Sequence, residues 1–233
     1  MFKTVSGRRV TAFVLALAAS AALLLAETFL WKNRQYYLSS VILLILAIAM
    51  LFARFERRRP QVREIVILAV MTALAVAGRA AFYWAPQFKP VCAIVILTAV
   101  AFGAESGFMT GAAAGLISNF FFGQGPWTPW QMVSFGLVGY LAGMLFRGTA
   151  VKRTPLLVYG FLSVLIVYGI IMDTANVLMY SQAVTWPLLL ASYVSGFAFN
   201  LIHAAATVVF LLLLQEPILS KLRRINTKYG ILE

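Results

Sequence analysis

The chain has 233 residues, of which 62% are hydrophobic and 11% are charged, and its formal net charge is +12. Soluble domains carry about 25% charged and 45–50% apolar residues, so this composition excludes an ordinary soluble enzyme. The single cysteine, Cys92, excludes a disulfide framework, and the single histidine, His203, excludes a multi-histidine metal centre. We therefore expect an integral membrane protein, and no residue pattern indicates a cofactor or a metal.

Apolar segments suited to membrane helices, which need about 20 residues, follow one another along the chain. Eight are found, at residues 10–30, 38–53, 65–84, 91–104, 107–122, 130–146, 156–180 and 187–214. Backbone in lipid must satisfy its own hydrogen bonds, so all eight are predicted to be helices. The two segments at 91–104 and 107–122 are short, and we expect them to be tilted, kinked or covered by neighbours. The expected fold is an all-α, polytopic membrane helical bundle.

The basic residues predict the orientation of this bundle. With the N-terminus in the cytoplasm, fifteen of the nineteen Lys and Arg residues fall on the cytoplasmic side. Only Lys32, Arg34 and Lys89 fall on the outer side, and Arg79 lies inside a segment. Cytoplasmic loops of membrane proteins carry the excess of basic residues, so both termini are predicted to be cytoplasmic. The positive charge thus indicates membrane orientation rather than nucleic-acid binding.

The clearest internal boundary is the basic stretch Phe55–Glu64, FERRRPQVRE. It separates two plain hydrophobic segments from six that contain glycines, aromatic residues and polar groups. We therefore expect an N-terminal transmembrane hairpin and basic loop at 1–60, followed by a six-helix core at 61–233. The first segment also has features of a secretory signal peptide, but its apolar run continues to Leu30, which favours a retained anchor.

Small residues recur every four positions in two places. Ala69, Ala73 and Ala77 would line one face of the third segment, and small residues at this spacing let another helix approach closely. This stripe either packs within the chain or docks a separate membrane subunit. The ladder formed by Gly103, Gly107, Gly111 and Gly115 is predicted to serve internal packing.

Two predicted outer loops are rich in aromatic residues and proline. The segment Asn119–Met132, NFFFGQGPWTPWQM, contains two prolines and two glycines, which exclude a continuous helix. Its tryptophans either anchor the chain at the membrane interface or line a ligand site with nearby polar groups. The second loop, Phe82–Pro90, repeats this composition, and two such loops on one face suggest a shared pocket. The candidate ligand-binding residues of the two loops are Tyr83, Trp84, Asn119, Gln124, Trp127, Thr128, Trp130 and Gln131.

The last six segments also contain polar residues within the membrane. Arg79 is their only base and Asp173 their only acid, so an ion pair between the two is expected, unless Arg79 extends to the outer interface. Asp173 and Asn176 share a face of the seventh segment, and Asn200 and His203 lie on a polar face of the eighth. His203 either hydrogen-bonds to a neighbouring helix or takes part in chemistry. Together with the two loops, these residues are expected to form the ligand-binding site, and its members within the membrane are Arg79, Asp173, Asn176, Asn200 and His203.

Several catalytic motifs are absent from the sequence. It contains no Gly-x-Ser-x-Gly elbow, no His-Glu-x-x-His zinc helix and no Walker phosphate loop. The chain therefore cannot hydrolyse ATP itself, and any uphill transport must draw its energy from a partner or an ion gradient.

Three stretches together resemble the substrate-specific S component of energy-coupling factor (ECF) vitamin transporters. They are REIVILAVMTALAVAGRAAF (63–82), FKPVCAIVIL (88–97) and FGQGPWTPWQM (122–132). The resemblance covers residues 61–233 and implies a six-helix membrane protein that binds a micronutrient near its outer face. It also implies partners, namely a transmembrane scaffold subunit and two cytoplasmic ATPases. In the family an alanine motif on the first core helix contacts the scaffold, which corresponds here to Ala69, Ala73 and Ala77.

The sequence is similar to the S components assigned to cobalamin and related corrinoids, so a corrinoid is the expected ligand. The main prediction is a non-enzymatic subunit that captures this ligand for an ATP-driven importer. Two alternatives are an intramembrane enzyme that acts on a lipid through His203 and Asp173, and a membrane scaffold protein without a small-molecule site.

Overall fold

The structure is a computed structural model that describes residues 61–146 and 151–229, together with eight positions between 42 and 56. The described residues form helices joined by short connections and contain no strand, which confirms the all-α prediction. The predicted N-terminal hairpin at 1–60 lies outside the described residues, apart from those eight positions.

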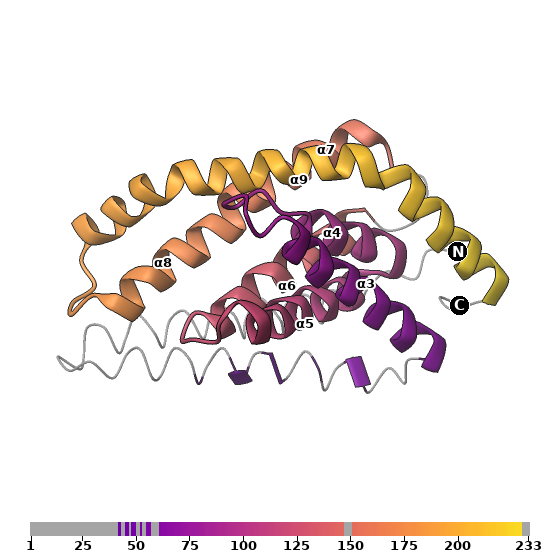
Figure 1. Cartoon of the computed structure of the whole chain (residues 1–233), viewed down its shortest axis with the longest axis horizontal. Coiled ribbons are helices and arrows are strands. Elements are labelled where there is room, and N and C mark those ends of the chain that lie inside the picture. Colours follow the sequence, from indigo (N-terminus) through magenta and orange to yellow (C-terminus); the bar gives the residue numbers. More distant parts are fainter. Residues whose placement is uncertain are drawn as a thin grey trace.

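The described helices follow one another with few connecting residues (Figure 1). The first four are α3 (Val62–Ala81), α4 (Val91–Phe102), α5 (Ala104–Phe122) and α6 (Thr128–Leu145). A continuous helical stretch then consists of α7 (Arg153–Leu162), the π-helical segment η1 (Ser163–Tyr168) and α8 (Gly169–Tyr180). The last helix, α9 (Trp186–Tyr229), extends along one side of the other helices (Figure 1).

Three helical stretches are long and apolar enough to cross a membrane. These are Val62–Ala81, Arg153–Tyr180 and Trp186–Leu222. They support the prediction of a protein that crosses the membrane more than once. The full number of spans and the side on which the termini lie stay predictions.

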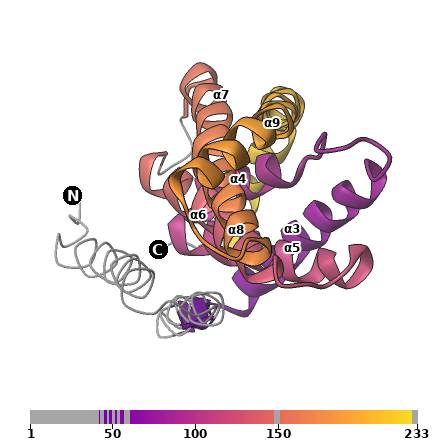
Figure 2. The same ribbon diagram turned by 90° about the vertical axis from the view of Figure 1, so that its left-hand side faces the viewer.

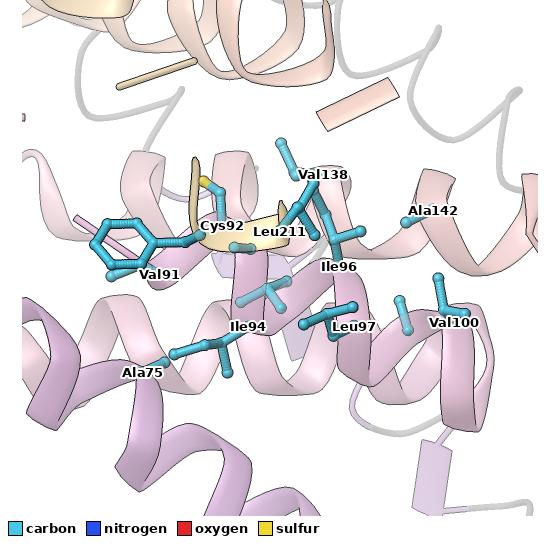
Figure 3. Close-up of a cluster of buried hydrophobic side chains, with 14 of the residues drawn as sticks. Ala75, Val91, Cys92, Ile94, Ile96, Leu97, Val100, Val138, Ala142 and Leu211 are labelled. Carbon is cyan, nitrogen blue, oxygen red and sulfur yellow. The ribbon is translucent and has the colours of Figure 1, made fainter. Parts of the chain in front are cut away.

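The short helix α4 forms the centre of the core. Its 12 residues span about 18 Å at 1.5 Å per residue, less than the roughly 30 Å of a bilayer's hydrocarbon layer. Every residue from Val91 to Val100 is buried, and the helix packs against α3, α5, α6, α7 and α9. Figure 3 shows its side chains together with Val138, Ala142 and Leu211 of the surrounding helices. Neighbouring helices, rather than lipid, therefore surround this segment, which agrees with the expectation that it is covered.

The glycine ladder brings α5 and α6 into backbone contact. A Cβ atom at Gly111 would lie 2.5 Å from the carbonyl group of Phe135, and one at Gly107 would lie 2.8 Å from the carbonyl oxygen of Gly139. Only glycine permits such an approach. The prediction of internal packing is therefore confirmed for Gly107 and Gly111, whereas Gly103 has no close neighbour at its Cβ position and breaks the helix instead.

Three features of the helices differ from the predicted segments. Gly103 alone separates α4 from α5, because its φ of 92° breaks the helix in one residue where a longer turn was expected. The seventh segment contains η1 rather than α-helix throughout. The last helix continues from the predicted end at 214 to Tyr229, with Pro217 inside it, because Leu219 and Leu222 pack onto the core.

Candidate functional site

The two aromatic loops contact each other. The Tyr83 ring stacks on Phe122 with centroids 5.3 Å apart, which joins the Phe82–Pro90 loop to the end of α5. The rings of Phe82 and Phe88 pack on Phe210 of α9, with centroids 5.0 and 5.4 Å apart. The loop is thereby held between α5 and α9. The predicted proximity of the two loops is confirmed, whereas a ligand between them stays a prediction.

Asn119 is the centre of a hydrogen-bond network at the connection between α5 and α6. It is buried, and its amide nitrogen donates to Thr128 Oγ1 over 3.0 Å and to Gln131 Oε1 over 2.8 Å. The Thr128 hydroxyl in turn donates to Gln124 Oε1 over 2.8 Å. We call Arg79, Ser118, Asn119, Gln124, Thr128 and Gln131 the Asn119 network. Because most of its polar groups bind one another, the network first of all shapes the loop.

Arg79 connects this network to α3. Its Nη1 donates to Ser118 Oγ and, over 3.0 Å, to Asn119 Oδ1, and its guanidinium carbon lies 5.1 Å from the centre of the Phe122 ring. A guanidinium has five N–H donors, and only Nη1 has partners here. The N–H groups of Nε and Nη2 have no hydrogen-bond partner among the described residues. A partly buried cation beside an aromatic stack thus keeps donors for another molecule.

The predicted ion pair between Arg79 and Asp173 is wrong. Asp173 Oδ2 instead accepts from the Asn200 amide over 2.8 Å, and its backbone carbonyl accepts from the Ser192 hydroxyl over 2.8 Å. The reason is helix placement, because α3 packs against α4 and α5, whereas α8 packs against α6, η1 and α9. Hydropathy gives the depth of a charged residue but not the helix that it faces.

Close approach of α8 and α9 makes the Asp173–Asn200 pair possible. A Cβ atom at Gly196 would lie 2.3 Å from Asp173 Oδ1, and one at Gly169 would lie 2.8 Å from Asn200 Nδ2. Asn176, predicted on the same face as Asp173, is exposed, and its amide donates to Ser192 over 3.5 Å. Asp173 and Asn200 therefore join α8 to α9, and Asn176 lies at the edge of this contact.

His203 lies beside two aromatic rings and next to α4. Its Nε2 is 3.6 Å from Cys92 Sγ, and its ring meets those of Tyr168 and Phe135 edge-on, with centroids 4.8 and 6.2 Å away. The residue is 3% exposed, and Nδ1 has no hydrogen-bond partner among the described residues. Asp173 does not contact it, so the pair that the enzyme alternative requires does not form.

Trp130 presents a second unpartnered polar group. Its indole is 6% exposed, and its N–H has no acceptor among the described residues. The three tryptophans predicted for the site differ in burial, since Trp130 is buried, Trp127 is half-buried and Trp84 is exposed. Burial of Trp130 argues against a pure interfacial anchor, because an anchor places its N–H in the polar interface.

Two cations lie near the aromatic loops, Arg79 at the end of α3 and Lys89 in the Phe82–Pro90 loop. Lys89 Nζ donates a hydrogen bond to the Ala85 carbonyl over 3.2 Å. In the loop, burial of Lys89 and then the positive charge of Arg79 lower the pKa of its ammonium group below the ordinary value. Among the described residues, no carboxylate forms an ion pair with either cation.

The alanine stripe lies on the outside of the helix. Ala69, Ala73 and Ala77 are all exposed, whereas Leu68 and Ala75 on the opposite side of α3 are buried. In the end-on view of Figure 2, α3 stands at the periphery of the described helices. The stripe therefore does not pack within the described part of the chain, and docking of a separate subunit stays a prediction.

Sequence reasoning missed three residues of these clusters. Ser118 directly precedes the polar and aromatic segment Asn119–Met132, and this position could have indicated it. Cys92 and Tyr168 gave no signal, since Cys92 is an ordinary apolar position. Tyr168 ends the π-helical segment, where α-helical spacing no longer tells which side chains face inward.

Comparison with known families decides the class of protein. Residues 59–222, more than two thirds of the chain, match the family described as ECF-type riboflavin transporter, S component. The chain belongs to this family. S components are parts of membrane transporters rather than enzymes, so the enzyme alternative loses its support. The resemblance to ECF S components is confirmed, whereas the corrinoid subgroup is not.

A shorter similarity connects the chain to a UPF0397 protein of Vibrio atlanticus. The two are 31% identical over 87 residues, which make up 35% of this chain and 47% of the relative. The match thus spans about half the length of that relative. No solved structure matches the chain.

Proposed function

We propose that the chain is the ligand-capturing subunit of an ATP-driven ECF importer and binds a vitamin-like micronutrient beneath its two aromatic loops. The single observation that supports this most is Arg79, a partly buried cation with uncommitted donors, placed against the Tyr83–Phe122 stack. Binding sites combine apolar area with a few placed polar groups in this way. The buried, unpartnered atoms Trp130 Nε1 and His203 Nδ1 are further candidates for ligand contacts.

The ligand is expected to carry hydrogen-bond acceptors and a large unsaturated ring. The N–H groups of Arg79 and Trp130 are donors only, so carbonyl or phosphate oxygens suit them. Riboflavin, named in the family description, has ring carbonyls of this kind and is the first candidate. Cobalamin and related corrinoids, whose amide side chains offer similar acceptors, are the second candidate because of the resemblance of the sequence to their S components.

The proposed partners are a transmembrane scaffold subunit and two cytoplasmic ATPases. The exposed alanine stripe on α3 offers the scaffold a face on which two helices can approach closely. In this proposal the chain binds its ligand without ATP, and hydrolysis on the partner drives release to the cytoplasm.

Substitution of Arg79 tests the site. We expect Arg79→Met to weaken binding at least ten-fold, because it removes the charged donors but keeps the length of the side chain. Lys152→Met, at an exposed cation before α7, is the matched control and should bind as the wild type does. Titrations with riboflavin, cobalamin and cobinamide would identify the ligand. Equal affinity of wild type and Arg79→Met for the bound compound would refute this site.

A further inference from the structure

The last helix is longer than a membrane requires. Its 44 residues correspond to about 66 Å, about twice the hydrocarbon thickness of roughly 30 Å. The apolar stretch that could cross the membrane ends at Leu222, and α9 continues to Tyr229. The end of α9 therefore lies at or beyond a membrane surface.

This terminal segment is packed against the protein rather than free. Leu219 and Leu222 are buried in the main hydrophobic cluster, and Ile218 and Ile225 pack against it from the same helix. The apolar side of the segment is thus already covered, and its orientation about the helix axis is fixed.

The opposite side of the segment is cationic. Lys221, Arg224 and Lys228 are exposed and follow the i, i+3, i+7 spacing of one helix face, which we call the basic face. Lys221 and Arg224 form no hydrogen bond or ion pair with the described residues. The only acid of α9 is Glu216, so the segment carries an excess of positive charge.

The basic face lies on the same side of α9 as the exposed Leu213. At about 100° per residue, Leu213, Lys221, Arg224 and Lys228 fall within a sector of roughly 80°. Leu213 is 64% exposed within the apolar stretch, as expected for a side chain that meets lipid tails. Lys221 follows it by roughly 12 Å along the axis. A surface that meets lipid tails and turns basic within this distance fits lipid headgroups better than a protein partner.

We propose that the basic face of α9 binds the phosphate groups of anionic phospholipids in the adjoining leaflet. Each Lys or Arg near an anionic membrane surface strengthens association by roughly five-fold, so Lys221 and Arg224 together give about 25-fold. This bound lipid would hold the end of α9 at the membrane surface. The proposal does not depend on which vitamin the chain binds.

Lipid retention by the full chain tests the proposal. Protein purified in a neutral detergent is mixed with equal amounts of phosphatidylglycerol and phosphatidylcholine, and the retained lipids are measured by mass spectrometry. We expect the wild type to prefer phosphatidylglycerol and Lys221→Gln/Arg224→Gln/Lys228→Gln to lose at least ten-fold of this preference. The matched control Lys221→Arg/Arg224→Lys/Lys228→Arg keeps the charge and should keep the preference, and salt should weaken it in both.

Two outcomes would overturn the proposal. One is an unchanged lipid preference in the neutral variant. The other is loss of the scaffold subunit from this variant at unchanged lipid preference, a form of the first outcome that would also assign the face to a protein partner. If the triple variant does not fold, Arg224→Gln alone should lower the preference by roughly five-fold, and no change would refute the proposal. Vitamin titrations of the same variants should match the wild type, which separates this test from that of the binding site.

Discussion

Removal of the Asn119 side chain tests whether its hydrogen-bond network holds the α5–α6 connection. Asn119 is 1% exposed and bonds to Arg79, Thr128 and Gln131. A neutral hydrogen bond contributes about 1 kcal/mol and one to a charged group about 1.5–3 kcal/mol. With some compensation by entering water, we expect Asn119→Ala to destabilise the protein by about 3 kcal/mol. For a chain of this size that corresponds to a melting temperature lower by about 6–12 °C.

The matched control comes from the same network. Gln124 also forms two hydrogen bonds, one accepted from Thr128 and one donated to the Leu116 carbonyl, but it is exposed. Water can replace its bonds, so Gln124→Ala should cost less than about 1 kcal/mol. Thermal unfolding of both variants in one detergent, without ligand, gives the comparison. An Asn119→Ala shift no larger than that of Gln124→Ala would show that burial of the network does not stabilise the protein.

Three further predictions concern packing, docking and pH. Gly111→Ala should lower the melting temperature more than Gly115→Ala does. The new Cβ atom would lie 2.5 Å from the backbone of α6 at position 111 but 3.2 Å from it at position 115. Equal shifts of the two variants would contradict this reasoning. Ala73→Trp should abolish co-purification with the scaffold subunit but spare ligand binding, whereas Leu74→Trp, exposed beside the stripe, should spare both; an intact complex with Ala73→Trp would disprove the docking face. The pKa of Lys89 is lowered, so the residue loses its proton at a lower pH than a free lysine. Ligand affinity should therefore fall at a pH below the ordinary lysine pKa of about 10.4, and a Lys89→Gln variant with an equal fall would exclude this cause.

The sequence predicted the features that depend on local composition. Proline and glycine placed the Phe82–Pro90 loop and the break between α5 and α6 correctly, because these residues restrict or free the backbone itself. The glycine ladder predicted close packing because the absence of a Cβ is a property of single residues. The length of the apolar runs predicted helices that are long enough to cross a membrane, because it depends on composition along the chain alone. Three such stretches are found among the described residues.

Features that depend on helix rotation and tilt could not be predicted. The partners of Arg79 lie on α5 and that of Asp173 lies on α9, although both residues appeared equally suited to pair with each other. The extension of α9 to Tyr229 depends on burial of Leu219 and Leu222 by distant parts of the chain. Such contacts arise from tertiary packing. They extend the helix beyond residue 214, although the basic residues that follow predicted the end of the membrane span there.

The most direct test of ligand capture is calorimetric titration of the purified chain, in detergent and without ATP. The panel should contain riboflavin, cobalamin, cobinamide and other vitamins. We expect tight one-to-one binding of one compound, with binding weakened in Arg79→Met. A well-folded chain that binds no vitamin of the panel would contradict the proposed function.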